Sequence, residues 1–229
     1  MSSSSIRPHT PNLRLYIDSA DVEVYDTWLS TGLFYGVTCN PTLVRKAGLA
    51  CDVVVLKELA RDALSLGAQE VHLQAWGADV EMLAWVGRQL AKIDRRVLVK
   101  LPATLEGTTV ARSLIRDDIP VTLTAVYAVH QVMIAAALGA SYVAPYLGRI
   151  SDSGRDGRAD VAQMQQILNA VRSQTRILTA SIRELEDIPV LAAQGVDTFT
   201  FSDAIARAFF EVPATVDATA AFEQAAQSA

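Results

Sequence analysis

The chain has 229 residues, a length that fits one large domain and that a single α/β barrel commonly reaches. Its formal net charge of −5 excludes a broadly basic surface for nucleic acid or anionic membranes, and no apolar run is long enough to cross a bilayer. Apolar residues make up 51% of the sequence, which predicts extensive buried sheet or a large interface between subunits. Cys39 and Cys51 lack CxxC or metal-binding spacing and favour a reducing compartment, so we expect a cytoplasmic protein.

The amino-terminal segment, residues 1–12, is rich in serine, proline and threonine and has no apolar core. This composition predicts a flexible tail and not a signal peptide. No linker interrupts the remainder, so we expect residues 13–229 to form a single domain.

Short apolar segments alternate with amphipathic ones along this domain. Strands are expected at 13–18, 36–40, 70–75, 97–101, 120–123, 141–146, 176–180 and 198–201. Helices are expected at 22–29, 53–66, 79–93, 104–116, 126–138, 160–172, 184–193, 203–210 and 213–226, with a polar loop at 148–158. Such alternation predicts a parallel sheet covered by helices, and eight strands predict a (β/α)8 TIM barrel with an extra C-terminal helix. A doubly wound open sheet is the alternative, but no G-x-G-x-x-G follows the first strand.

Polar side chains stand at the carboxyl ends of most expected strands, which is where barrel enzymes place their catalytic residues. The residues on or beside these ends are Asp18, Asn40, Gln74, Lys100, Thr124, Tyr146 and Ser181. Any one of them could be a helix cap or the start of a loop. Seven at one mouth of a barrel predict an active site.

Lys100 ends an apolar run that starts at Val97. Burial disfavours the charged ammonium, and a neutral amine is a nucleophile toward carbonyls. A lysine that extends from the strand end into solvent is the alternative. Lys46, Lys57 and Lys92 fall in segments that we expect to be solvated, so Lys100 is the one lysine that an apolar strand is expected to deliver into the mouth.

Other residues at the same strand ends could support chemistry at this lysine. Asp18 would supply a carboxylate that orients substrate hydroxyls and moves a proton. Thr124, Tyr146 and Gln74 could hold a water molecule for imine formation and proton transfer.

Two arginines and a serine follow the sixth and seventh expected strands: Arg149, Ser181 and Arg183. Barrels often bind phosphate with the loops after their last strands, and arginine grips a phosphate monoester through two donors. The alternative, in which both arginines form surface ion pairs, stays open.

The three histidines, His9, His72 and His130, are scattered and show no H-E-x-x-H or His–carboxylate spacing. We therefore expect neither a metal nor another cofactor. The lysine would then have to supply the electron sink itself.

Six segments match the motifs of one family in order and spacing. They are LYIDSA at 15–20, GVTCNPT at 36–42, VKLPATLEG at 99–107, TAVY at 124–127, YVAPYLGRI at 142–150 and TASIR at 179–183. The sequence thus resembles the transaldolase family, specifically its short subfamily, which includes fructose-6-phosphate aldolase.

The resemblance implies a barrel in which Lys100 forms a Schiff base with the C2 carbonyl of a ketose phosphate and Asp18 is the acid–base group. It assigns the hydroxyls of the donor sugar to Asn40, and we group Thr38 with it as a substrate-binding residue.

By the same resemblance, Thr124, Gln74 and Tyr146 surround the catalytic water, and Arg149, Ser181 and Arg183 bind the acceptor phosphate. The expected ligands are small sugar phosphates. The subfamily also implies a homo-oligomer, a decamer of two stacked five-membered rings in which the C-terminal helix reaches a neighbour.

Positions near the site separate two branches of the family. Gln74, Ala144 and Tyr146 agree with the aldolase branch, Gly148 with the transaldolases and Thr122 with neither. A phenol and a water-holding amide favour release of free dihydroxyacetone, so the sequence favours a fructose-6-phosphate aldolase.

Three alternatives remain. The first is a transaldolase of the pentose phosphate pathway, which transfers dihydroxyacetone from fructose or sedoheptulose phosphate to an aldose phosphate. The second is a metal-free phosphosugar isomerase with a carboxylate base. The third is a catalytically silent barrel that serves as a binding or assembly module.

Overall fold

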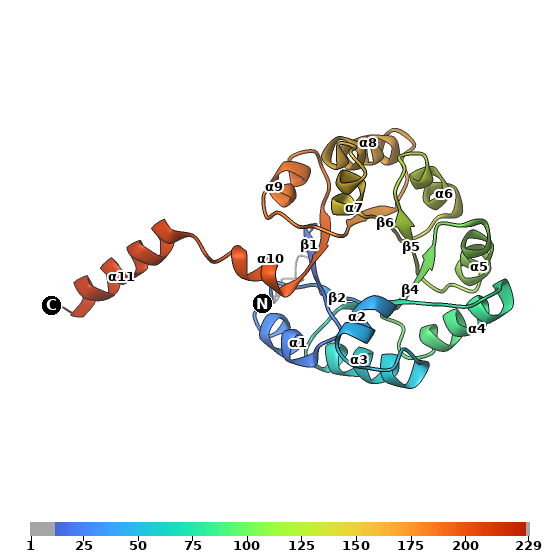
Figure 1. The fold of residues 1–229 in the computed structure, drawn as a ribbon, viewed down its shortest axis with the longest axis horizontal. Coiled ribbons are helices and arrows are strands. Elements are labelled where there is room, and N and C mark those ends of the chain that lie inside the picture. Colours follow the sequence, from blue (N-terminus) through green and yellow to red (C-terminus); the bar gives the residue numbers. More distant parts are fainter. Residues whose placement is uncertain (1–11, 228–229) are drawn as a thin grey trace, which may run out of the picture.

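Eight parallel strands close into a barrel in chain order, as a computed structural model of residues 12–227 shows (Figure 1). The strands are β1 (Arg14–Asp18), β2 (Gly36–Thr38), β3 (Glu70–Gln74), β4 (Val97–Pro102), β5 (Val121–Val126), β6 (Tyr142–Pro145), β7 (Arg176–Thr179) and β8 (Thr198–Phe201). This confirms the predicted (β/α)8 barrel.

Helices follow the strands and surround the barrel (Figure 1). They are α1 (Val22–Leu29), α2 (Pro41–Lys46), α3 (Val53–Ser65), α4 (Val80–Ala91), α5 (Leu105–Arg116), α6 (Gln131–Leu138), α7 (Leu147–Asp152), α8 (Gly157–Ala170), α9 (Asp187–Ala192), α10 (Asp203–Ala208) and α11 (Pro213–Gln227). Among the described residues, no helix has the length and apolarity to cross a membrane.

Both faces of the barrel wall are buried, which explains why the strands are apolar along most of their length. Successive side chains of a strand point to opposite faces, so Ile17 packs against the helices whereas Tyr16 lies inside the barrel. The smaller apolar cluster inside the barrel consists of Tyr16, Leu98, Tyr142, Ala144 and Leu178.

A polar network fills the barrel interior near the amino-terminal ends of the strands. The Glu70 carboxylate accepts hydrogen bonds from the hydroxyls of Tyr16 at 2.6 Å and Tyr142 at 2.8 Å, and it pairs with Arg14 at 3.2 Å. Burial alone would raise the pKa of Glu70, but hydrogen bonds from His72, Tyr16 and Tyr142 outweigh it and lower the pKa to about 2. Glu70 therefore stays ionised, and its bonds to Arg14, Tyr16 and Tyr142 tie β1, β3 and β6 together.

His72 continues this network upward along β3. Its Nδ1 lies 2.9 Å from the Thr122 hydroxyl and its Nε2 lies 3.4 Å from Glu70. Burial lowers the pKa of His72, which favours a neutral ring at neutral pH. His72 is thus a core residue whose two nitrogens both have partners.

Two short helices, α2 and α7, lie where the sequence predicts none. The Asn40 side chain accepts hydrogen bonds from two backbone N–H groups in the first turn of α2, and Pro41 suits that turn. In α7, Leu147 and Ile150 are three residues apart and both pack into the core. The polar loop predicted at 148–158 is therefore wrong for residues 148–152.

The fifth strand is longer than predicted: β5 continues to Val126, where a helix was expected to begin. Ala125 has a positive φ of 58°, and the pairing with β6 shifts register between Leu123 and Val126. The Gln131 side chain accepts hydrogen bonds from the backbone N–H groups of Tyr127 and the next residue, which delays the start of α6.

The last helix, α11, projects away from the barrel (Figure 1) and buries no residue. At the other end of the chain, the tail expected at residues 1–12 lies outside the described residues apart from Asn12.

Candidate active site

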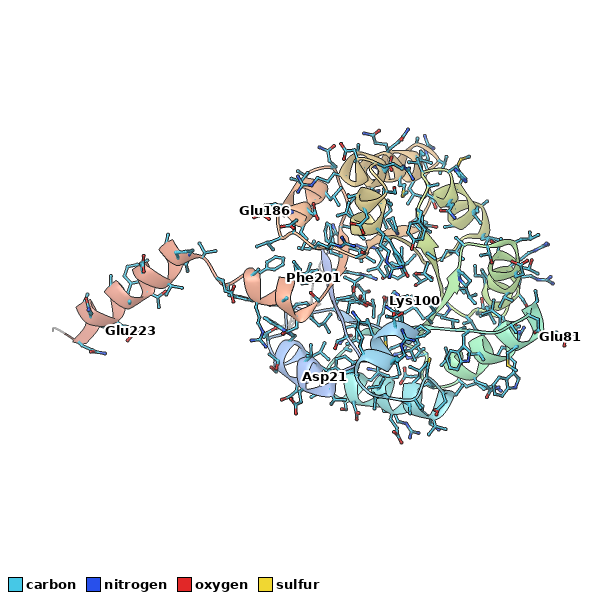
Figure 2. The ribbon with its side chains drawn as sticks, in the orientation of Figure 1. Asp21, Glu81, Lys100, Glu186, Phe201 and Glu223 are labelled. Atoms are coloured by element: carbon cyan, nitrogen blue, oxygen red, sulfur yellow. The ribbon has the colours of Figure 1, made fainter. Side chains whose placement is uncertain are left out.

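Lys100 lies inside the ring of strands (Figure 2), and only 4% of its surface is exposed. Its Nζ donates a hydrogen bond to the carbonyl oxygen of Cys39 at 3.1 Å. A cleft of about 370 Å³ opens above it at the carboxyl-terminal mouth of the barrel. Seven of the predicted site residues line this cleft: Asp18, Asn40, Gln74, Lys100, Tyr146, Arg149 and Ser181.

Asp18 at the end of β1 is held by a pair of buried threonines. Thr38 donates its hydroxyl hydrogen to the Asp18 carboxylate at 2.6 Å, and its oxygen lies 2.6 Å from the hydroxyl of Thr200. A hydroxyl has one hydrogen, so Thr200 is the donor to Thr38. Burial raises the pKa of Asp18, while the charge of Lys100 and the bond from Thr38 oppose the shift.

Thr124 and Tyr146 meet directly, with 2.9 Å between their hydroxyl oxygens. Thr124 is buried below the cleft and Tyr146 lines it. The side chain of Gln74 lines the same cleft and forms no hydrogen bond with the described part of the chain. These three groups can hold a small polar molecule between them.

Asn40 caps α2 with its side-chain oxygen, which leaves its NH2 group free. Its Oδ1 accepts hydrogen bonds from the backbone N–H groups of Thr42 at 3.0 Å and Leu43 at 3.1 Å. Its NH2 group has no partner among the described residues, although Asn40 lines the cleft. The cap of α2 and a substrate-binding role are therefore compatible.

The predicted phosphate residues separate into two groups. Arg149 lines the cleft, where its guanidinium lies 5.0 Å from the centre of the Tyr146 ring and donates a hydrogen bond to the Tyr127 hydroxyl at 3.1 Å. Ser181 also lines the cleft, in a left-handed conformation with φ 58°.

Arg183 is not among the residues that line this cleft. Its guanidinium forms two hydrogen bonds of 2.5 Å with the carboxylate of Asp152. It passes close to Gly148, where a Cβ, if the residue had one, would lie 2.9 Å from Arg183 Nε and 2.5 Å from the Ser181 carbonyl oxygen. The ion-pair alternative thus describes Arg183 in this conformation.

Three further residues at the mouth are absent from the sequence-based site: Lys46, Tyr127 and Thr200. Lys46 is exposed at the last position of α2, as expected for a solvated lysine, and it also lines the cleft. Tyr127 lies in the matched TAVY segment. Thr200 alternates with Phe199 and Phe201 along β8, a pattern that marks it as facing the barrel interior.

Other nucleophiles and metal ligands are poorly placed. Burial raises the pKa of the Cys39 thiol to about 12, so the thiol stays protonated at neutral pH. Within residues 12–227, no group of three or more His, Cys, Asp and Glu side chains is arranged to hold a metal ion.

Comparison with known proteins places this site in a family. The sequence matches the family described as transaldolase/fructose-6-phosphate aldolase over residues 15–229. A protein of Hyphomonas neptunium named probable transaldolase is 32% identical over 203 residues, which cover 89% of this chain and 92% of that protein. A protein of Methanococcus maripaludis with the same name is 30% identical over 210 residues, which cover 92% of this chain and 95% of that one.

Among solved structures, thiamine phosphate pyrophosphorylase from Pyrococcus furiosus superposes with a TM-score of 0.59 at 15% identity, over 84% of this chain and 87% of that one. This likeness shows the shared fold alone. The match over residues 15–229 and the identity with full-length relatives establish that the chain belongs to the transaldolase/fructose-6-phosphate aldolase family, as an aldolase or transferase of sugar phosphates.

Proposed function

We propose that the protein cleaves a ketose phosphate through a Schiff base on Lys100. The observation that carries this proposal is a buried lysine amine in the cleft, close enough to the half-buried Asp18 for its charge to act on the pKa of that carboxyl. A carbonyl compound in the cleft would meet a nucleophile and an acid–base group together.

The proposed steps use these two residues in turn. The Lys100 amine adds to the C2 carbonyl, and loss of water gives an iminium ion. Asp18 takes the proton of the C4 hydroxyl as the C3–C4 bond breaks. The electron pair of that bond moves into the iminium ion to form an enamine, and the aldehyde phosphate leaves. Burial of Asp18 favours this role, because a raised pKa brings a carboxyl nearer to the working pH.

The enamine must then be protonated and the imine hydrolysed. We propose that the Thr124 and Tyr146 hydroxyls, 2.9 Å apart, and the Gln74 amide hold the water for these steps. Dihydroxyacetone would then leave without an acceptor, which makes the protein a fructose-6-phosphate aldolase.

Transaldolase activity is the second candidate, favoured by the names of the relatives from Hyphomonas and Methanococcus. The two activities share every step up to the enamine. They differ in whether water or an aldose phosphate then reacts with it. The rates of fructose 6-phosphate consumption with and without erythrose 4-phosphate separate them.

Phosphate binding is proposed for Arg149 and Ser181, which line the cleft, and for Arg183 if it leaves Asp152. Asn40 and Thr38 are proposed to serve the donor end of the sugar, Asn40 through its free NH2 group and Thr38 through its bond to Asp18.

Borohydride reduction tests the central step. Incubation with fructose 6-phosphate followed by reduction should add one dihydroxyacetone unit to the peptide that contains Lys100. The Lys100→Met variant should take up none while it keeps its far-ultraviolet circular dichroism. An adduct on Lys46, the other lysine of the cleft, would refute the assignment. Turnover without any trapped adduct would favour the isomerase, and no turnover with any ketose would favour the silent barrel.

We further propose a homo-oligomer, a decamer by resemblance, in a reducing compartment such as the cytoplasm. Val216 and Phe222 on α11 are 58% and 72% exposed, and apolar side chains on a projecting helix favour a contact between copies. Both cysteines are free thiols. Light scattering on the full chain and on a chain that ends at Val212 should show a large assembly only for the first.

A further inference from the structure

A large cavity lies at the opposite end of the barrel from Lys100. It has a volume of about 940 Å³ and is bounded by the starts of β1, β3, β6 and β7, the turn before β4 and the ends of α6 and α8. This volume is within the range of small-molecule sites in proteins. The amino-terminal end of a barrel ordinarily serves stability, so an open cavity there needs its own explanation.

The rim of the cavity carries an excess of positive charge. Five arginines line it: Arg14, Arg95, Arg96, Arg172 and Arg176. Glu70 is the one acidic residue among those that line it. This concentration of positive charge contrasts with the net charge of −5 of the whole chain.

Three of these arginines already have partners. Arg14 pairs with Glu70 at 3.2 Å, Arg96 with Asp94 at 3.0 Å and Arg176 with Asp197 at 2.6 Å.

The side chains of Arg95 and Arg172, both exposed, form no ion pair and no hydrogen bond with the described residues. Their donors are free to grip an anion. Arg95 lies near the Asp94 carboxylate, whose pKa its charge helps to lower, and Arg172 lines the same cavity. An anion in the cavity would be attracted to both guanidiniums.

The walls of the cavity are apolar. Met133 on α6, Ile167 on α8, Leu98 at the base of β4 and Val171 after α8 supply them, together with alanines of α6 that leave the space open. Met133 and Val171 are 56% and 57% exposed. Apolar walls under a basic rim match a molecule with a charged head and an apolar body.

We propose that this cavity is a second ligand site, which takes an organic anion with an apolar ring system, the anionic group lying between Arg95 and Arg172. A carboxylate, a sulfonate or a phosphate ester has the required charge and accepts paired hydrogen bonds from guanidinium groups.

A stabilising role of the arginines is the rival explanation. The carboxyl ends of α6 and α8 carry partial negative charge, which favours nearby cations such as Arg172. Arg116, the last residue of α5, offers a matched control, because it also lies at the carboxyl end of a helix, has no ion pair in the described chain and does not line the cavity.

The test compares two dyes with nearly the same ring system. Anilinonaphthalene sulfonate carries a negative charge, and N-phenyl-1-naphthylamine is neutral. Fluorescence titration and calorimetry on the full chain should show one sulfonate bound per chain. Arg95→Ala and Arg172→Ala should each weaken sulfonate binding by about tenfold or more, and the neutral dye much less. Arg116→Ala should change neither.

Two further arms locate the bound dye. Ala137→Trp, which places a large ring in the cavity from the exposed side of α6, should abolish binding of both dyes. Saturating fructose 6-phosphate should displace neither. The proposal is overturned if no dye binds, if the arginine variants weaken both dyes equally or not at all, if Ala137→Trp has no effect, or if the sugar phosphate displaces the dye.

Discussion

We expect the hydroxyl of Tyr146 to separate the two activities of the family more sharply than any other group in the cleft. Tyr146→Phe removes this hydroxyl and keeps the ring, which lies under the Arg149 guanidinium at 5.0 Å and 5.5 Å from the Tyr127 ring. The change deletes one hydrogen bond, the 2.9 Å contact with Thr124. Since Tyr146 lines the cleft, the remaining Thr124 hydroxyl can turn toward water.

The size of the effect follows from the number of groups proposed to hold the water. A well-placed general acid or base contributes about 10²–10⁴-fold to a rate. Removal of one of three holders should then slow acceptor-free cleavage by about 10- to 100-fold, or about 1.4–2.7 kcal/mol of barrier. One lost hydrogen bond costs only about 0.5–1.5 kcal/mol of folding free energy, so the variant should remain folded.

The assay measures release of glyceraldehyde 3-phosphate from fructose 6-phosphate, with and without erythrose 4-phosphate. Tyr146→Phe should slow the reaction without acceptor and leave transfer to the acceptor unchanged or faster. Tyr127→Phe is the control, because it removes a hydroxyl of the same cleft that contacts Arg149 and not Thr124. If the wild type transfers far faster than it cleaves and Tyr146→Phe leaves that ratio unchanged, the protein is a transaldolase and the reasoning fails.

Four further substitutions test three separate parts of the structure. Arg149→Ala should raise KM for fructose 6-phosphate by about tenfold to a hundredfold but leave KM for unphosphorylated sugars nearly unchanged. A smaller effect of Arg183→Ala would mean that Arg183 stays with Asp152. Equal effects on both kinds of sugar would place the arginines outside the phosphate site. Asn40→Asp keeps an oxygen for the α2 cap but loses the free NH2 group, so KM should rise while the melting temperature stays unchanged. A large fall in the melting temperature would contradict the assignment of the cap to Oδ1 and of substrate binding to the NH2 group. Glu70→Gln should cost about 3 kcal/mol of unfolding free energy at pH 7, because the pKa of Glu70 falls from 4.5 to about 2 on folding. Because the pKa of Glu70 is lower in the folded state, the ionised carboxylate stabilises the fold at pH values above the pKa of the unfolded state. Urea unfolding should therefore show the difference in unfolding free energy between wild type and Glu70→Gln shrinking as pH falls from 4.5 to 2. A difference that stays constant over this range would refute the role of the Glu70 charge.

The barrel and most of its mouth could be predicted because both depend on local sequence pattern. Short buried strands have a period of two, so the residues that end them face the cleft together once the sheet closes. Asp18, Gln74 and Lys100 are found there for this reason. The predicted end of the fifth strand is three residues short of Val126, but this error does not change the alternation of Thr122, Leu123 and Thr124.

The remaining features depend on contacts between distant segments, which no local pattern encodes. Whether Arg183 faces the cleft or solvent depends on Asp152, 31 residues earlier in the chain, and on the absence of a side chain at Gly148 between them. Lys46 reaches the mouth because it ends α2, the helix that Asn40 caps. This helix has six residues and is too short to show a helical period in the sequence.

The surroundings of the polar residues on β3 also depend on contacts between distant segments. Glu70 and His72 alternate along β3 into the interior with Gln74, so the period alone places all three on one face. Their chemistry differs because Tyr16, Tyr142 and Arg14 close over Glu70 at one end of the barrel, whereas the other end opens to the cleft at Gln74. A carboxylate surrounded by donors gains stability from its charge, and an amide with free hydrogen-bonding groups gains none until a ligand or water arrives. One strand thus supplies a structural charge at its start and a reactive-site group at its end.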